Sequence, residues 1–159
     1  MKLSETADKV NAFLDSYRVA FERLDAAAIA DHFAYPSHIT SDMGEIVLVP
    51  IPAKEDWTGE IEGLLGMYGA IGFRSAGVLN MALTEILPRL VQAVVHWELR
   101  DGEGGSLYDF QAIYTLAEID GALRISAIAH NEIPRYRECL ARLRSLGTLG
   151  GGSPEAPDR

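Results

Sequence analysis

The stretch Tyr114-Thr115-Leu116-Ala117-Glu118-Ile119-Asp120-Gly121-Ala122-Leu123-Arg124-Ile125 decides the fold of this chain. Asp120-Gly121 lies between two runs of aliphatic, aromatic and β-branched residues, and this dipeptide is a strong signal for a two-residue hairpin turn. The pattern predicts two paired antiparallel strands, over 106–119 and 122–131.

Further strands are predicted on the N-terminal side of this hairpin. The glycine-rich turn Asp101-Gly102-Glu103-Gly104-Gly105 connects the strand at 106–119 to a preceding strand, and Pro88 separates that strand from another. A turn at Asp42-Met43-Gly44 predicts a short hairpin nearer the N-terminus. The additional strands are expected over 37–41, 45–49, 73–87 and 90–100.

Four helices are predicted around these strands. Apolar residues recur every three or four positions between Ser4 and Leu24, which is typical of an amphipathic helix with one buried stripe. Asp25 and Asp56 stand where they can cap the next two helices, and Gly147 ends the last one. The expected helices span 4–24, 26–33, 57–68 and 134–146.

The length and composition of the chain fit one domain. A chain of 159 residues, 48% of them hydrophobic, can bury a substantial core but is short for two domains. We expect one α+β domain over 1–146, in which N-terminal helices close the concave side of a curved antiparallel sheet and form a cone-shaped barrel with an internal pocket. Glycines and prolines after the last helix predict a disordered tail over 147–159.

Charge and cysteine content exclude several classes of partner. The formal net charge of −9 disfavours binding to nucleic acid or to an anionic membrane, and no basic cluster reverses it locally. The single cysteine, Cys139, rules out an internal disulfide and multi-cysteine zinc sites.

No signal-peptide pattern and no apolar run long enough for a membrane span is present. A cytoplasmic protein is therefore expected.

Three segments carry a resemblance to a known superfamily: Phe13-Leu14-Asp15-Ser16-Tyr17, Ala30-Asp31-His32-Phe33-Ala34 and the hairpin quoted above. Together with the element order, they make about residues 4–135 similar to the nuclear transport factor 2-like superfamily, which includes ketosteroid isomerase and the SnoaL-like polyketide cyclases. The resemblance implies the fold more than an activity, because this scaffold is used by isomerases, dehydratases, hydrolases, cyclases and pure binding modules.

Strand registers divide the predicted sheet into two faces. We expect Leu99 to pair with Leu107 and Ile119 with Ala122, and side chains alternate between faces along each strand. The face expected to line the pocket carries Trp97, Asp109, Gln111, Ile113, Ile128 and His130. The opposite face carries His96, Phe110, Ala112, Tyr114, Ala127 and Ala129.

Both predicted faces are apolar enough to need a cover. Helices are expected to fill the concave face, and a second copy of the chain is expected to cover the convex face, giving a homodimer. The first face combines an apolar wall with a few convergent polar groups, which is typical of a small-molecule site.

The resemblance to ketosteroid isomerase implies catalytic roles for residues at comparable places. In such proteins a carboxylate near the first hairpin moves a proton, while a tyrosine on the first helix and an acid on a long strand polarise a carbonyl. Asp42 and Tyr17 match the first two roles, and Asp109 or Gln111 would fill the third. Structural interpretations remain open: Asp42 as a turn residue, Tyr17 as a packed ring, and Asp109 at an exposed strand end.

Histidines supply the remaining candidates. His38 on the first strand titrates near neutral pH, which suits either a proton shuttle or a surface position. The triplet His130-Asn131-Glu132 either lines the pocket mouth or ends the last strand. The histidine spacing does not fit a metal site, so no metal and no cofactor is expected. His130 joins the catalytic candidates, and Trp97, Gln111, His38 and Asn131 are the ligand-binding candidates.

Two hypotheses follow for the function. The first is a SnoaL-like domain that binds a small, mainly hydrophobic molecule with a carbonyl or hydroxyl group, with isomerase, cyclase or dehydratase chemistry left open. The alternative is a non-catalytic ligand-binding or dimerisation module on the same fold. The enzyme hypothesis requires Asp109 and Tyr17 to converge on one enclosed cavity, because acid–base chemistry needs hydrogen-bond reach to a common substrate.

Overall fold

The computed structural model describes residues 3–147, which form four helices and six strands. The disordered tail predicted beyond Gly147 lies outside the described residues. The strand predicted over 37–41 begins at Phe33, and the helix predicted over 57–68 begins at Lys54. The elements are α1 (Leu3–Glu22), α2 (Ala26–Ala30), β1 (Phe33–Asp42), β2 (Ile46–Ile51), α3 (Lys54–Ala70), β3 (Phe73–Leu87), β4 (Leu90–Asp101), β5 (Ser106–Ile119), β6 (Ala122–His130) and α4 (Glu132–Ser145).

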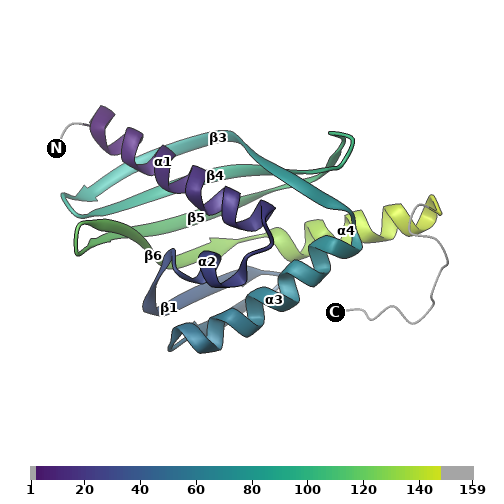
Figure 1. Cartoon of the computed structure of the whole chain (residues 1–159), viewed down its shortest axis with the longest axis horizontal. Coiled ribbons are helices and arrows are strands. Elements are labelled where there is room, and N and C mark those ends of the chain that lie inside the picture. The colour runs from purple at the N-terminus through teal and green to yellow at the C-terminus, as the bar shows by residue number, and fades with distance from the viewer. Residues whose placement is uncertain (1–2, 148–159) are drawn as a thin grey trace.

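The strands form a single curved sheet in the order β2-β1-β6-β5-β4-β3. Helices α1, α2 and α3 lie across one face of it (Figure 1). The expected α+β fold, with N-terminal helices on the concave side of a curved sheet, is confirmed. The sheet does not close and is mixed, because β1 pairs with β6 in parallel while the other neighbours are antiparallel.

Helix α1 presents its apolar stripe to the sheet. Val10, Leu14, Tyr17 and Ala20 follow the helical period, and each is at most 6% exposed. The α1–α2 corner is fixed by Asp25, whose Oδ1 accepts a hydrogen bond from the Ala28 backbone N–H at 3.1 Å. The cap predicted from the sequence is thus formed, and α1 covers the concave face along its length.

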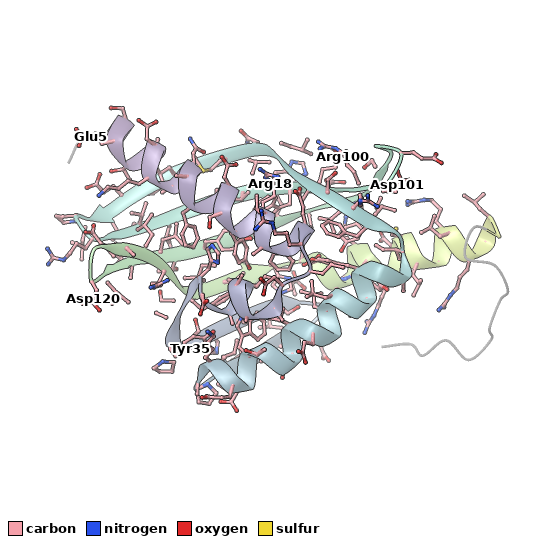
Figure 2. The ribbon with its side chains drawn as sticks, viewed as in Figure 1. Glu5, Arg18, Tyr35, Arg100, Asp101 and Asp120 are labelled. Atoms are coloured by element: carbon pink, nitrogen blue, oxygen red, sulfur yellow. The ribbon has the colours of Figure 1, made fainter. Side chains whose placement is uncertain are left out.

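The β4–β5 and β5–β6 hairpins turn at opposite ends of the sheet, at Asp101 and at Asp120 (Figure 2). Asp120 (φ 52°) and Gly121 (φ 82°) both adopt the left-handed conformation that a two-residue hairpin turn of this type requires. Ile119 pairs with Ala122 as predicted. The decisive hairpin therefore begins in the expected register.

A β-bulge overturns the predicted register between β4 and β5. Arg100 pairs with Ser106, as the prediction requires, but Leu99 then pairs with Tyr108, leaving Leu107 as an extra residue. Every later pair is shifted by one position, so Trp97 lies opposite Phe110 instead of Asp109. A shift of one residue moves a side chain to the other face of a sheet.

A second bulge changes the pairing between β5 and β6. Leu116 pairs with Ile125 but Thr115 pairs with Ala127, so Ser126 is the extra residue. The predicted pairing of Gln111 with His130 is wrong for this reason. The concave face carries Trp97, Phe110, Ala112, Tyr114, Ile128 and His130, and the convex face carries His96, Asp109, Gln111, Ile113, Ala127 and Ala129.

Helix α4 takes the place of β6 beside the first part of β5. Strand β6 ends opposite Ala112, so the backbone of β5 before that residue has no strand on this side. Arg135 Nε donates to the Asp109 carbonyl at 2.9 Å, and Arg142 donates to the Leu107 carbonyl at 2.8 Å. The two arginines, seven residues apart on one helix face, thus bind successive carbonyls on one side of the strand.

Among residues 3–147, none of the helices is long and apolar enough to cross a membrane.

Strand β2 offers a matched test of the face assignment. Ile51 is 2% exposed in the core, whereas Ile46 on the same strand is 61% exposed on the opposite face. We expect Ile51→Ala to lower the free energy of unfolding by about 3 kcal/mol, since it leaves a cavity in the core. Ile46→Ala should change it by less than about 0.5 kcal/mol in urea unfolding. Equal losses for both variants would contradict the assigned faces.

Candidate functional site

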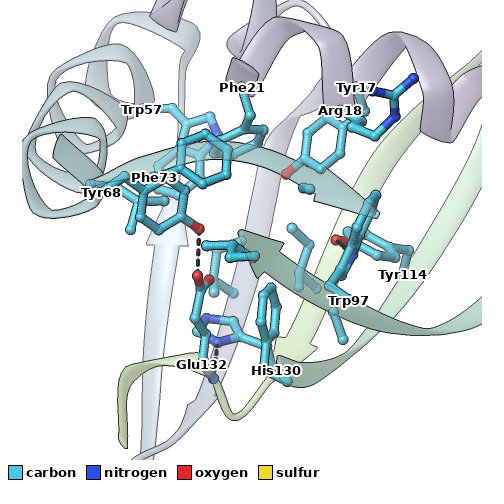
Figure 3. A pocket seen from close by; sticks show the side chains of 17 residues that line it. Tyr17, Arg18, Phe21, Trp57, Tyr68, Phe73, Trp97, Tyr114, His130 and Glu132 are labelled. Carbon is cyan, nitrogen blue, oxygen red and sulfur yellow. Dashed lines mark hydrogen bonds between the residues drawn. The ribbon is translucent and has the colours of Figure 1, made fainter. Parts of the chain in front are cut away.

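A cavity of about 90 Å³ lies between α1, α3 and the concave face of the sheet. Aromatic rings supply much of its wall, and Figure 3 shows the labelled ones arranged around it. The volume is below the roughly 150 Å³ of an engineered protein cavity that binds benzene. The cavity therefore suits a small molecule or a small part of a larger one. The aromatic lining residues are Tyr17, Phe21, Trp57, Tyr68, Phe73, Trp97, Phe110 and Tyr114.

Two hydrogen-bond donors of this wall have no partner among residues 3–147. The indole Nε1 of Trp57 on α3 is buried without a hydrogen bond. The hydroxyl of Tyr17 on α1 also forms none with the described residues, and Figure 3 shows it directed towards the other lining side chains. Burial raises the pKa of Tyr17 well above its usual value, so its hydroxyl keeps its proton. A buried donor without an acceptor is costly, which makes both groups candidates for binding a ligand.

The sheet side of the cavity holds a fixed pair. Trp97 Nε1 donates to the Tyr114 hydroxyl at 2.8 Å, from neighbouring strands β4 and β5. Because Trp97 supplies the hydrogen for this bond, the Tyr114 hydroxyl keeps its own hydrogen to donate. Burial raises the pKa of Tyr114, so this hydroxyl is neutral as well.

His130 ends β6 at the floor of the cavity. Its Nδ1 accepts the Glu132 backbone N–H at 3.1 Å, so in the neutral ring the proton is on Nε2. Burial lowers the pKa of His130, which favours this neutral form at neutral pH. The imidazole is therefore a further donor on the lining.

Glu132 supplies the carboxyl group of the cavity. It is 7% exposed, at the start of α4, and lies beside His130 in Figure 3. Its Oε2 accepts hydrogen bonds from the hydroxyls of Tyr68 and Tyr108, the second at 2.7 Å. Burial raises the pKa of Glu132, and the two hydroxyls partly offset this effect.

The cationic group on the lining stands at the edge of the cavity and is already paired. Arg18 Nη1 contacts both carboxylate oxygens of Glu22 at 3.0 Å, and its Nη2 lies 3.7 Å from Asp15. In Figure 3 the guanidinium points away from the other labelled side chains. Arg18 therefore forms no ion pair with Glu132, the carboxyl group of the cavity.

The structure brings together three of the eight residues proposed from the sequence. Tyr17, Trp97 and His130 line the cavity. The other five lie outside its lining, on the convex face or at strand ends: Asp42, Asp109, Gln111, His38 and Asn131.

Asp109 lies on the convex face and is held by a hydrogen bond to His96 and an ion pair with Arg135. Its Oδ2 is 2.6 Å from His96 Nε2, and its Oδ1 is 3.1 Å from Arg135. The hydrogen bond from His96 is the main cause that lowers the pKa of Asp109, and Arg135 adds to it. The expected convergence of Asp109 and Tyr17 on one cavity is not found, because the bulge at Leu107 turns Asp109 away.

The other four predicted residues lie in turns, at strand ends or on exposed strand faces. Asp42 accepts the Gly44 N–H at 3.1 Å in the β1–β2 turn, and His38 is exposed on β1. Asn131 Oδ1 accepts the Gln111 N–H at 2.9 Å, which extends the β5–β6 pairing by one position. Gln111 itself is exposed on the convex face.

Several lining residues were not predicted. Trp57 and Tyr68 lie on a helix whose glycines weaken the sequence pattern, although nothing within 4 Å requires glycine at Gly59, Gly63 or Gly66. Tyr114 was assigned to the other face by the missed bulges. Glu132 was named only within the triplet His130-Asn131-Glu132, for which the sequence left open whether it lines the pocket mouth or ends the strand.

Within the described part of the chain, no cluster of three or more His, Cys, Asp or Glu residues could hold a metal ion.

Comparison with family models gives one match. Residues 5–133 match the model described as NTF2-like protein (DUF6841). A search of curated proteins finds no match to this chain.

Solved structures similar to this one share its fold at low identity. A structure of Aln2 from a Streptomyces species has a TM-score of 0.66 at 15% identity, covering 82% of this chain and 93% of that one. An NTF2-like protein with a cystatin-like fold from Novosphingobium aromaticivorans has a TM-score of 0.64 at 14% identity, covering 81% and 82%. A domain of unknown function with a cystatin-like fold from Nostoc punctiforme has 0.61 at 13%, covering 82% and 78%.

The raised pKa of Glu132 predicts a pH dependence of stability. The folded protein binds this proton more tightly than the unfolded chain, so stability falls as pH rises from the ordinary glutamate pKa to the raised one. Glu132→Gln should remove this component. We therefore expect the melting temperature of the wild type, relative to that of Glu132→Gln, to fall between pH 4 and pH 8.

Glu60→Gln is the matched control, because Glu60 is exposed on α3 and undergoes the same loss of charge. Its melting curves should follow those of the wild type at every pH. Parallel pH profiles for the wild type and Glu132→Gln, measured by circular dichroism, would show that Glu132 has no raised pKa.

Proposed function

The chain belongs to the NTF2-like family DUF6841, and from this fold and the chemistry of its cavity we propose that it binds a small, mainly hydrophobic molecule carrying a carbonyl or hydroxyl group. The observation that carries the proposal is an aromatic cavity with hydrogen-bond donors that have no acceptor among residues 3–147. Trp57 Nε1 is buried without a partner, and the Tyr17 hydroxyl points towards the cavity (Figure 3). A carbonyl or hydroxyl oxygen would accept from them, while the rest of the molecule contacts the rings.

The balance of donors and acceptors supports an acceptor group on the ligand. His130 Nε2 and the Tyr114 hydroxyl add two further donors to the lining. Only Glu132 adds a carboxyl, and one of its oxygens is occupied by two tyrosine hydroxyls. A purely apolar ligand would leave these donors unpaired, which disfavours it by the cost of each missing hydrogen bond.

Acid–base chemistry on the bound molecule would depend on Glu132 and His130. Burial shifts their pKa values, upward for Glu132 and downward for His130, whereas the tyrosines of the lining keep their protons because burial raises their pKa values. Asp42 and Asp109 lie outside the cavity lining. Binding alone is the function that the geometry supports best.

Both tryptophans of the chain line the cavity, so their indole signals report on binding. We expect cyclopentanone and cyclopentanol, titrated into ¹⁵N-labelled protein, to shift the Trp57 indole N–H signal, with methylcyclopentane binding more weakly. Tyr17→Phe should weaken cyclopentanone binding about threefold to tenfold, which is the effect of one hydrogen bond.

Tyr35→Phe is the control for this variant, because it removes the same atom outside the cavity. The Tyr35 hydroxyl donates to the Ala30 carbonyl at 2.7 Å. Its loss should leave ligand affinity unchanged. If methylcyclopentane binds as tightly as cyclopentanone, the proposed role of the free donors is wrong.

A second proposal concerns a partner: we propose that two copies of the chain associate through the convex face. One aligned residue from each strand forms a row across this face, which we call the convex stripe. Leu48 is 62% exposed, and Ile113 and Val94 are each 40% exposed. The stripe consists of Leu48, Thr40, Ala129, Ile113, Val94 and Ala82.

The absence of charge in the convex stripe supports a second copy as the partner. Each chain has a formal net charge of −9, and an uncharged contact surface lets two copies meet without like charges directly opposite one another. An apolar row across a sheet also suits face-to-face packing with the same row of a second sheet.

Ile113→Lys should convert a dimer into a monomer, because it places a like charge at the centre of both contacting surfaces. Ile119→Lys is the control: Ile119 is on the same strand, has nearly the same exposure at 41%, and lies outside the convex stripe. Light scattering after gel filtration should give twice 17.3 kDa for the wild type and for the control. A monomeric wild type would contradict the proposal.

A further inference from the structure

Glu132 is a buried carboxyl group whose hydrogen-bond partners are neutral. The Tyr68 hydroxyl from α3 and the Tyr108 hydroxyl from β5 donate to the same oxygen, Oε2. Neither oxygen forms an ion pair with a Lys, Arg or His of the described residues. Two hydroxyl donors stabilise an ionised carboxylate less than a cation does, so part of the cost of burying this charge remains.

The second oxygen of Glu132 is available to a ligand. Oε1 accepts no hydrogen bond from residues 3–147, although the side chain lines the cavity. In Figure 3 the carboxyl group rises from one side of the cavity, whereas Tyr17 and Trp57 lie on the other. The interior therefore has an acceptor group at one end and unpaired donors at the other.

The walls between these ends consist largely of aromatic rings. The face of an aromatic ring attracts a cation, most strongly for tryptophan, and the attraction increases when the site excludes water. Trp57 and Trp97 are both part of the lining, with Phe21, Tyr68, Phe73 and Phe110. The cation nearest to this site, Arg18, is bound to Glu22 and Asp15 at the edge and does not compete.

We propose that the ligand carries a basic nitrogen, which binds in its ammonium form to Oε1 of Glu132 between the aromatic rings, while its carbonyl or hydroxyl group accepts from Tyr17 and Trp57. This inference rests on the proposed function, because it places the ligand in the same cavity. It narrows the ligand class to small amino ketones and amino alcohols with an apolar body. A neutral molecule can also donate a hydrogen bond to Oε1, but only a cation compensates the carboxylate charge.

Two probes of equal size separate a cationic from a neutral ligand. The first, 3-methylbutylamine, is an ammonium ion at pH 7, and 3-methylbutan-1-ol is its neutral counterpart with the same number of heavy atoms. We expect the wild type to bind the amine more tightly than the alcohol by about tenfold or more, since a charge-assisted hydrogen bond replaces a neutral one. The indole signals of Trp57 and Trp97 should shift with both probes, which locates them in the cavity.

Glu132→Gln is the decisive variant, because it keeps the shape of the side chain and removes its charge. The two probes should then bind within about threefold of each other. Glu60→Gln removes the same charge from the exposed face of α3 and should retain the preference for the amine. A preference that persists in Glu132→Gln overturns the inference, because it would come from the overall negative charge of the protein.

If Glu132→Gln does not fold, the wild-type comparison is made at high salt, which screens the overall charge of the protein but acts much less on a buried pair. Equal affinities of the amine and the alcohol overturn the inference and leave the proposed function intact, since the alcohol still binds. An amine preference accompanied by shifts of both indole signals supports it. Failure of the amine, the alcohol and cyclopentanone alike to move either indole signal contradicts the inference and the proposed function together.

Discussion

Two tyrosine hydroxyls, one from α3 and one from β5, donate to a single carboxylate oxygen at the start of α4. This contact at Glu132 joins three elements that are distant in sequence, and it holds the last residues of the sheet against the helical layer. The position of His130 depends on it too, because the imidazole accepts the backbone N–H of the same glutamate. The floor of the cavity is thus built around one buried carboxyl group, whose burial is stabilised by hydroxyls and by no cation of the described residues.

The predicted fold followed from local patterns that tertiary contacts did not override. The helical period of α1, the cap at Asp25 and the turn at Asp120-Gly121 each depend on neighbouring residues alone, and each formed as expected. The predicted registers also began correctly at both turns. Such features can be read from a single sequence, because their energetics involve residues a few positions apart.

The candidate site was only partly predictable, because two bulges decide which side chains enter the cavity. One extra residue, at Leu107 and again at Ser126, moved Asp109 and Gln111 out of the concave face and brought in Tyr114. Neither extra residue is a glycine, and the first bulge leaves the adjacent residues Leu107 and Tyr108 both buried, which alternation along a regular strand does not predict. Tyr17 was identified correctly as a lining residue because helix periodicity has no comparable one-residue ambiguity.

The sheet gives its two faces different chemistry. The concave face combines rings with unpaired donors. The convex face combines the uncharged convex stripe with Asp109, which binds His96 by a hydrogen bond and Arg135 by an ion pair. Neighbouring side chains along one strand thus point to opposite faces of the sheet and belong to different sites. Trp97 and His96 are adjacent in sequence, yet the first lines the cavity and the second pairs with Asp109 outside it.

Helix α4 has a consequence for where the chain can be shortened. The family match ends at residue 133, just after α4 begins. A chain cut there would lose Arg135 and Arg142, which bind the Asp109 and Leu107 carbonyls. The first part of β5 would then become an open strand edge, able to pair with any extended segment of another molecule. Helix α4 therefore protects this strand edge from pairing with other molecules, and it also supports the cavity floor.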